Sequence, residues 1–317
     1  MKVSVILTVK NEANTIEPLL DSLVAQTRVP DEIVICDAGS SDGTVGKISD
    51  FQSWLPIKLV IHEGANISAG RNIAIRAAEG PVIASTDAGV VLSPYWLEEI
   101  VAPIERGDAP VVSGWFEPDP YTDFEVVMGA TVLPARQDVE ADTFLPSSRS
   151  VAFLKTAWEA AGGYPEWLDY CEDLIFDLKL REEYGTFPLA SGAIAYFRPR
   201  GSLRAFARQY YLYARGDGKA NLWIKRHAIR YLAYLIGLPL IGRFIWRGKP
   251  LGLGLLAVGG TAYTIRPARR LWPATHGWSA PNRLRALALI PLIRVVGDVA
   301  KMIGYPVGVW WRWRNRS

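Results

Sequence analysis

The sequence is poor in the residues that build disulfide frameworks and histidine metal sites. Its 317 residues include only two cysteines, Cys36 and Cys171, so a disulfide-stapled fold is excluded and a reduced cytosolic setting is expected. The three histidines, at positions 62, 227 and 276, are too scattered along the chain to indicate a metal cluster.

Three further absences narrow the possible classes. No Gly-X-Gly-X-X-Gly motif follows the first apolar run, where Lys10-Asn11-Glu12 stands instead, and this argues against a dinucleotide-dependent oxidoreductase. The apolar run Val3–Val9 has no small-residue cleavage site after it, so a buried strand is expected rather than a signal peptide. No later stretch cleanly reaches the roughly 20 apolar residues of a spanning helix.

Acidic residues are almost missing from the C-terminal part. Residues 225–317 hold 16 Lys and Arg but one acid, Asp298, which leaves 19 basic and 31 acidic residues in 1–224. The same part is apolar and rich in tryptophan, which favours anionic lipid over nucleic acid, because no nucleic-acid-binding module accompanies the charge. Helices in the membrane interface or short re-entrant hairpins are expected, and a soluble helical subdomain is the alternative.

The N-terminal part alternates apolar β-branched runs with helical stripes. Strands are expected at 3–9, 32–36, 57–61, 82–85, 111–116, 151–154 and 193–197, and helices at 16–24, 68–79, from 93, 156–161, 172–184 and 202–215. This alternation predicts an α/β fold with a doubly wound, mostly parallel sheet and flanking helices. Asn14 is the expected N-cap of the first helix, and residues 117–146 are expected to form an irregular loop. The predicted domains are 1–222 and 223–317.

Carboxylates follow several of these elements. Asp37 ends the second strand, Asp87 follows the fourth, and Glu172 and Asp173 open a helix. An open α/β sheet binds ligands at the carboxyl ends of its strands. Carboxylate oxygens suit Mg²⁺ or Mn²⁺, and a helix N-terminus stabilises an ionised acid. The pattern predicts a site for a metal–diphosphate and for proton removal.

Six segments in this order resemble a family 2 glycosyltransferase of the GT-A fold, as in bacterial and archaeal enzymes that build glycans. They are residues 3–12, 37–44, 69–72, 86–89, 172–173 and 208–216, and the resemblance covers residues 1–222. It implies an inverting, hexosyltransferase-like enzyme that uses a nucleotide-diphosphate sugar, a UDP-sugar before a GDP-sugar, and Mg²⁺ or Mn²⁺.

The resemblance also implies roles for residues of the donor site. Asp37 would contact the nucleotide base or ribose, and Glu12 would be a second such contact. Val9 and Thr86 would also bind the donor, whereas Asp42 is better explained as a helix N-cap. Arg71 would bind nucleotide carbonyls or phosphate oxygens through its guanidinium fork.

The remaining implied roles concern the diphosphate and the reaction. Asp87 would bind the metal, although the second acid usual two residues later is replaced by Gly89. Asp173 would be the general base, with Glu172 orienting it. Arg208 and Arg215 would help to bind the diphosphate or face lipid headgroups.

The leading hypothesis is therefore an inverting glycosyltransferase on the cytoplasmic face of the cell membrane. Its acceptor would be a hydroxyl or phosphate of a lipid-linked or polysaccharide substrate, and no nucleic acid is expected as a partner. The alternative, motivated by Gly89, is a catalytically silent sugar-nucleotide-binding or membrane scaffold protein.

Overall fold

The computed structural model of the chain describes residues 1–315, which form two compact units. The first unit comprises Met1–Asp119 and Gln137–Arg198, and the second comprises Pro120–Arg136 and the described residues 199–315. The helix expected at 202–215 is part of the second unit. The functional division at residue 222 stays a prediction.

The first unit is built on one eight-stranded sheet with the order β3-β2-β1-β4-β7-β6-β8-β5. Its strands are β1 (Val3–Val9), β2 (Glu32–Asp37), β3 (Ile57–Ile61), β4 (Val82–Ser85), β5 (Val90–Leu92), β6 (Val111–Pro118), β7 (Val151–Leu154) and β8 (Leu189–Phe197). β3, β2, β1 and β4 run parallel, β7 is antiparallel to β4 and β6, and β8 pairs parallel with β6 and antiparallel with β5. The predicted α/β class is confirmed, and the sheet is mixed in its second half.

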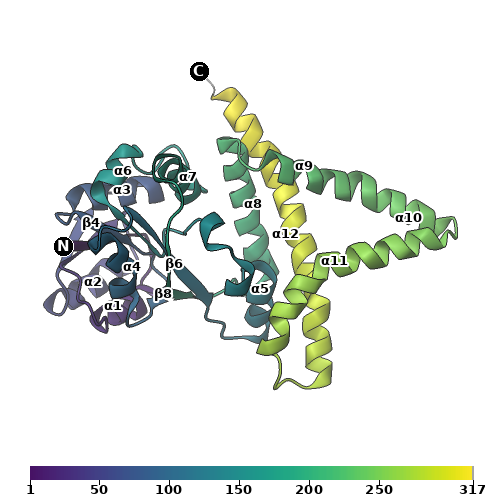
Figure 1. Cartoon of the computed structure of the whole chain (residues 1–317), viewed down its shortest axis with the longest axis horizontal. Coiled ribbons are helices and arrows are strands. Elements are labelled where there is room, and N and C mark those ends of the chain that lie inside the picture. The colour runs from purple at the N-terminus through teal and green to yellow at the C-terminus, as the bar shows by residue number, and fades with distance from the viewer. Residues whose placement is uncertain (316–317) are drawn as a thin grey trace. The chain divides into compact units, whose positions relative to one another are not determined.

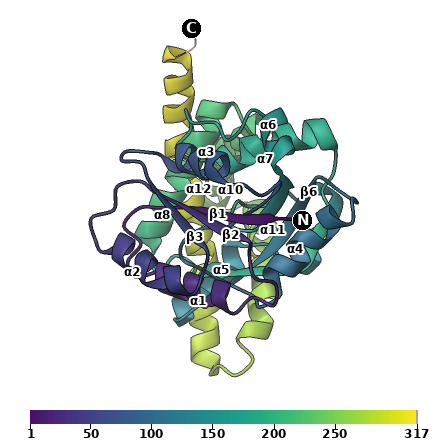
Figure 2. The same ribbon diagram turned by 90° about the vertical axis from the view of Figure 1, so that its left-hand side faces the viewer.

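Helices cover both faces of this sheet, as Figure 2 shows for β1 to β3. They are α1 (Ile16–Val24), α2 (Thr44–Asp50), α3 (Ile67–Ala77), α4 (Trp96–Glu105), α6 (Lys155–Ala160) and α7 (Glu172–Tyr184). Short 3₁₀ turns lie at Phe51–Ser53, Arg136–Asp138 and Ala141–Thr143. One core joins α1, α2 and α4 to one face, and a second joins α3, α6 and α7 to the other. β1 contributes to both cores, which explains its continuous apolar run.

Three local predictions are corrected. The N-cap of α1 is Thr15 rather than Asn14, and no side chain caps the helix. The segment 117–146 is not irregular throughout, because it contains α5 (Asp123–Val132), capped by Thr122. Apolar residues lie all round α5 and many are β-branched, so its sequence has no clear helical stripe. β5 was missed because it has only three residues.

The second unit is helical. It contains α5, α8 (Leu203–Ala220), α9 (Ile224–Leu232), a π-helical turn at Ala233–Gly237, α10 (Leu238–Trp246), α11 (Pro250–Ala274) and α12 (Ala280–Arg314). α8 packs closely on α12, since a Cβ atom added at Gly304 would lie 2.2 Å from the Tyr211 carbonyl oxygen and one at Gly308 would lie 2.0 Å from that of Arg215. Glycine at these two positions lets the helix backbones approach.

The stretch Ile224–Trp246 is one continuous exposed helix of 23 residues with mean hydropathy 1.4. By length and composition it is the one helix within residues 1–315 that qualifies as a membrane span. The expectation that no segment qualifies is thus corrected, because Lys225, Arg226 and Arg230 lie in the first two turns and Arg243 is the one charged residue after them. α10 and α11 pair as a hairpin whose tip lies between Trp246 and Pro250 (Figure 1).

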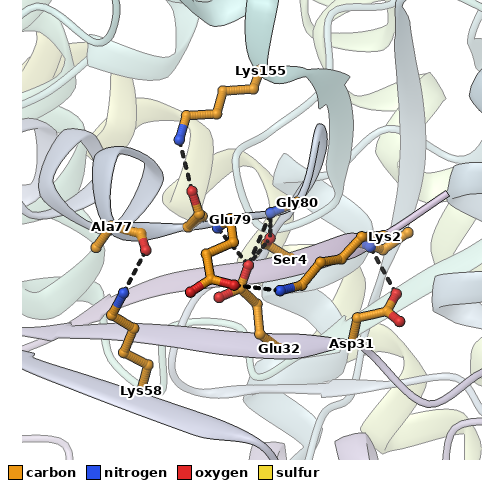
Figure 3. A network of polar contacts seen from close by, with 11 residues as sticks. Lys2, Ser4, Asp31, Glu32, Lys58, Ala77, Glu79, Gly80 and Lys155 are labelled. Atoms are coloured by element: carbon orange, nitrogen blue, oxygen red, sulfur yellow. Dashed lines mark hydrogen bonds and ion pairs between the residues drawn. The ribbon is translucent and has the colours of Figure 1, made fainter.

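In the first unit, a buried carboxylate, that of Glu32, joins the strands at the amino-terminal edge of the sheet (Figure 3). Glu32 is 8% exposed and accepts hydrogen bonds from the Ser4 hydroxyl and from the backbone N–H groups of Glu79 at 2.6 Å and Gly80 at 3.0 Å. Burial alone would raise the pKa of Glu32, but these hydrogen bonds outweigh it and lower the pKa below its usual value. The contacts fix the turn that leads from α3 into β4.

We expect Glu32→Ala to lower the free energy of unfolding by about 2 kcal/mol at neutral pH, since it removes three hydrogen bonds to a charged group. Urea denaturation measures this difference. Because the folded pKa lies below the unfolded one, the stabilisation is present above the unfolded pKa and fades as the pH falls through the folded pKa.

The neighbouring Glu79→Ala is the matched control. Its side chain is 67% exposed and pairs with Lys2 at the surface, so the urea midpoint should stay unchanged. Equal losses in the two variants would contradict the role given to Glu32.

Candidate active site

Three strands of the first unit end together at the carboxyl edge of the sheet. The parallel register pairs Val9, the last residue of β1, with Asp37, the last residue of β2. Directly after β4, the Thr86 N–H donates to the Ile6 carbonyl on β1 at 3.1 Å. The loops that carry Asp37 and Asp87 therefore leave the sheet from the same edge, where α/β sheets bind ligands.

Asp37 is buried and uses its two carboxylate oxygens differently. Oδ1 accepts hydrogen bonds from the N–H groups of Gly39 at 2.9 Å and Ser40 at 2.8 Å, and Gly39 has the positive φ of 87° that this tight loop requires. Oδ2 is buried and has no donor within residues 1–315. One oxygen thus builds the loop, and the other retains acceptor capacity for a ligand N–H or hydroxyl.

Glu12 and Asp42 shape the neighbouring turn. The Glu12 N–H donates to the Thr44 hydroxyl at 2.8 Å, and the Glu12 carboxylate accepts from the Thr15 hydroxyl. Asp42 accepts from the N–H groups of Thr44 and of Ala13, both at 3.1 Å. The prediction that Asp42 is the N-cap residue of α2 is corrected, because the N-cap residue is Gly43 and Asp42 directly precedes it.

Arg71 on α3 joins two of the acidic loops. Its side chain is 2% exposed, Nη2 lies 2.6 Å from Asp87 Oδ1, and Nη1 lies 2.8 Å from Glu172 Oε1. Its guanidinium also lies 5.3 Å from the centre of the Tyr164 ring. The fork predicted to bind nucleotide thus holds the Asp87 loop against the start of α7.

The charges of this cluster influence one another. Burial alone would lower the pKa of Arg71, but Asp87 and Glu172 raise it overall, so the guanidinium stays charged. Burial, and then the neighbouring Asp173, raise the pKa of Glu172 to about 7 despite the contact with Arg71. A fraction of the Glu172 carboxyl groups is therefore protonated near neutral pH.

Asp173 is the second residue of the same helix, whose N-cap residue has an unusual conformation. This N-cap residue is Cys171, which has a φ of 66°, in the left-handed region. Asp173 Oδ1 accepts from the Leu174 N–H at 2.8 Å.

Sequence reasoning missed Asn72, which organises the loop before α7. Its Oδ1 accepts from Trp158 Nε1 at 3.0 Å and from the Tyr164 N–H at 2.9 Å. Its Nδ2 donates to the Tyr164 carbonyl and to Glu166, each at 2.9 Å. The amide thus uses all four of its hydrogen-bonding positions. The adjacency of Arg71 and Asn72 was the available signal, because consecutive residues of α3 hold α7 and the loop that leads to it.

Asp177 was also missed. It lies one turn after Asp173 on α7, is buried, and its Oδ2 has no donor within residues 1–315. Burial, and then the charge of Asp173, raise its pKa well above the usual value. Its spacing of four residues from Asp173 was the only signal in the sequence.

Arg208 and Arg215 lie on α8 in the second unit, seven residues apart. The other predicted site residues lie in the first unit. The predicted contact of these two arginines with the diphosphate stays a prediction.

Among the described residues at this edge of the sheet, Asp87 is the one side chain placed to bind a metal ion. No group of three or more His, Cys, Asp or Glu within residues 1–315 is arranged to hold a metal. One oxygen of Asp87 is bonded to Arg71, and Gly89 offers no second carboxylate. The residues fit a cation only if diphosphate oxygens and water complete its ligands.

Comparison with known proteins finds a family match for the part of the chain that carries Asp37, Arg71 and Asp87. Residues 4–144 match the sequence model of glycosyl transferase family 2. A validoxylamine A glucosyltransferase from Streptomyces hygroscopicus subsp. limoneus is 32% identical over 34% of this chain and 24% of its own length. The UDP-Glc:alpha-D-GlcNAc-diphosphoundecaprenol beta-1,3-glucosyltransferase of Escherichia coli is 33% identical over 36% of this chain and 46% of its own length. The chain thus spans less than half of these relatives.

Solved structures share the fold over nearly the whole chain. A mannosyltransferase from Pyrobaculum calidifontis, in complex with GDP-Man and Mn²⁺, has a TM-score of 0.55 at 19% identity and covers 100% of this chain and 88% of its own. S. aureus TarS 1–349 with UDP-GlcNAc has a TM-score of 0.54 at 18% identity, with coverage of 99% and 92%. The first unit is therefore of the GT-A type.

We expect Gly70→Ala to destabilise the protein by about 2 kcal/mol, because α3 approaches β1 too closely for a side chain. A Cβ atom at Gly70 would lie 2.2 Å from Thr8 Oγ1 and 2.9 Å from Thr8 Cβ. Urea denaturation measures the loss. Gly46→Ala is the control, since Gly46 is exposed in α2 with nothing within 4 Å, and it should be neutral or slightly stabilising. A neutral Gly70→Ala variant would contradict the close approach.

The raised pKa of Glu172 predicts how stability depends on pH. Between the unfolded and folded pKa values the folded state binds more protons, so the free energy of unfolding falls as the pH rises toward and through about 7. We expect Glu172→Gln to flatten this fall, measured by urea unfolding at about pH 5.5 and about pH 8.5. Parallel curves for the variant and the wild type would contradict the shifted pKa.

Proposed function

We propose that this chain is an inverting glycosyltransferase. The reason is that residues 4–144 match the sequence model of glycosyl transferase family 2. The enzyme transfers a sugar from a nucleoside-diphosphate sugar to a hydroxyl or phosphate of a lipid-linked or polysaccharide acceptor. The observation that carries the proposal is the buried Arg71, which joins the Asp87 loop to the Glu172-Asp173 helix start.

The donor would bind at the carboxyl edge of the sheet. The spare Oδ2 of Asp37 would accept a hydrogen bond from the base or ribose, and Val9, Glu12 and Thr86 would also contact the donor. Asp87 would hold Mg²⁺ or Mn²⁺ together with the diphosphate. A bound divalent cation would neutralise the charge that develops on the departing diphosphate.

The acceptor would be activated by Asp173. Its carboxylate takes the proton of the acceptor hydroxyl as that oxygen bonds to the anomeric carbon, and the bond from that carbon to the diphosphate breaks. The electron pair leaves with the nucleoside diphosphate, so one displacement inverts the configuration. Arg71 and Glu172 are positioning residues that hold Asp173 against the donor loop.

The acceptor class is inferred from relatives and from the second unit. The E. coli relative acts on a diphosphoundecaprenol-linked sugar, and an O-antigen chain rhamnosyltransferase of Salmonella typhimurium is 23% identical over 57% of this chain. The exposed apolar helix 224–246 and the basic, tryptophan-rich C-terminal part support association with the cytoplasmic face of a membrane.

A catalytically silent sugar-nucleotide-binding or scaffold protein is the second candidate. Gly89 favours it, because the site then lacks a second metal ligand. This candidate predicts nucleotide binding without turnover.

The proposed reaction predicts that Asp173→Asn lowers kcat by about 10²-fold or more while the affinity for nucleoside diphosphate persists, because only the general base is removed. Detergent-purified protein would be titrated calorimetrically with UDP, GDP, dTDP and CDP, with and without Mn²⁺, to measure binding. Turnover would be measured as nucleoside diphosphate released from a nucleotide sugar. Asp87→Ala should abolish the metal-dependent part of the binding.

Glu183→Gln is the matched control, since Glu183 is an exposed acid on the same helix α7. It should retain both binding and transfer. Full transfer by Asp173→Asn would contradict the mechanism, and metal-dependent binding with no transfer by the wild type would favour the scaffold.

A further inference from the structure

The second unit contains a polar cluster built around Asp298, the one acid of residues 225–317. Its carboxylate accepts hydrogen bonds from Arg230 Nε at 2.7 Å, from the Tyr263 hydroxyl at 2.6 Å and from the Tyr234 hydroxyl at 3.1 Å. The three donors come from α9, α11 and the π-helical turn. One carboxylate on α12 thus gathers three other segments.

Tyr234 reaches the cluster from an unusual backbone segment. It lies in the π-helical turn Ala233–Gly237, between α9 and α10. π-Helical turns are rare and are frequent at functional sites. The turn therefore marks this cluster independently of its charges.

Positive charge in the cluster exceeds negative charge. Arg294, Asp298 and Lys301 lie at spacings of four and three residues, so they share one face of α12. The Arg294 guanidinium lies 4.0 Å from the centre of the Tyr263 ring, and Lys301 Nζ lies 4.3 Å from that of Tyr210.

Within residues 1–315 neither Arg294 nor Lys301 forms a hydrogen bond or an ion pair with a carboxylate. A second carboxylate, Asp217 on α8, also acts on Lys301 and lies 3.1 Å from His227 Nε2, so these two cations and Arg230 exceed the charges of Asp298 and Asp217 by about one. Burial, and then Arg230, lower the pKa of Lys301 to about 8. Partly buried cations without countercharge are costly unless an anion completes the site.

The same face of α12 continues into an apolar aromatic groove. Tyr305 and Val309 follow Lys301 at successive steps of four residues. The groove has a volume of about 400 Å³ and is lined by Tyr231, Tyr305, Pro306, Val309, Trp310 and Trp313. Tyr305 stacks on His227 at 3.8 Å, and His227 Nδ1 lies 3.1 Å from Arg230 Nη1. The groove and the cationic cluster are therefore adjoining parts of one unit.

We propose that Arg230, Arg294 and Lys301 bind the phosphomonoester headgroup of a membrane lipid whose chain lies in the aromatic groove. The negative charge of a phosphate group complements this excess of positive charge, and the apolar groove suits a hydrocarbon chain. The inference rests on the membrane association proposed above and not on the transfer reaction.

Vesicle flotation with the full chain tests the site. The probes are phosphatidylcholine vesicles that carry either phosphatidic acid, a phosphomonoester, or phosphatidylserine, adjusted to the same surface charge. The wild type should prefer phosphatidic acid by about tenfold, and Arg294→Gln/Lys301→Gln should lose this preference. A conservative Lys301→Arg variant should keep it.

The matched control is Arg266→Gln/Arg269→Gln, which removes two charges from exposed positions on α11. It should weaken binding to both vesicle types equally and leave the preference intact. The site is refuted if the wild type shows no preference, if the site variant retains the preference, or if both double variants lose it equally. Displacement by free inorganic phosphate at concentrations matched to the lipid would refute a lipid as the occupant.

Failure of the site and failure of membrane association give different results. A wild type that binds both vesicle types equally contradicts the headgroup site alone. A wild type that binds neither contradicts membrane association as well, and the calorimetric nucleotide titration remains independent of both.

Discussion

The buried guanidinium of Arg71 is the interaction on which the first unit depends. A charge that is 2% exposed is costly unless its partners are well placed, and Asp87 and Glu172 supply them at 2.6 and 2.8 Å. These two carboxylates come from segments 16 and 101 residues away from Arg71 along the chain. Satisfying one cation therefore fixes the loop after β4 and the start of α7 relative to each other. Gly70 permits this geometry, because a side chain at that position would push α3 away from β1.

The charges of the two units are unbalanced in opposite directions. In the first unit one buried cation, Arg71, serves Asp87 and Glu172, and a further acid, Asp173, lies nearby on α7. Such a centre repels a diphosphate unless a cation accompanies it, which supports the proposed divalent metal even though the protein offers one ligand. In the second unit three cations surround Asp298, and the missing charge is negative. A bound cation would neutralise the excess negative charge of the first unit, and a bound anion would neutralise the excess positive charge of the second.

The sequence predicted best those features that depend on local patterns. The bounds of β1, β3, β4, β7 and α7 agree with the expected segments, because apolar runs flanked by polar residues are read directly. The placement of Asp37 and Asp87 after strands followed from the same patterns. The double ion pair of Arg71 did not, since its partners are distant along the chain. Asn72 and Asp177 were missed for the same reason, because their importance lies in what folding packs around them.

In the C-terminal part, hydropathy along the sequence underestimates the apolar surface that the folded unit exposes. Basic residues interrupt each apolar run, so no run in the sequence looks long enough to span a membrane. In the folded unit, however, Arg230, Arg294 and Lys301 gather around Asp298 and the tyrosines, which removes these charges from the outer surface. On α12 the exposed residues Leu292, Val295, Val299 and Ile303 then follow one another at helical spacing. An amphipathic surface results whose polar side faces inward, and such a surface requires either an apolar medium outside or an anion within. The headgroup of the proposed lipid would supply the anion within, and the membrane that contains this lipid would supply the apolar medium outside.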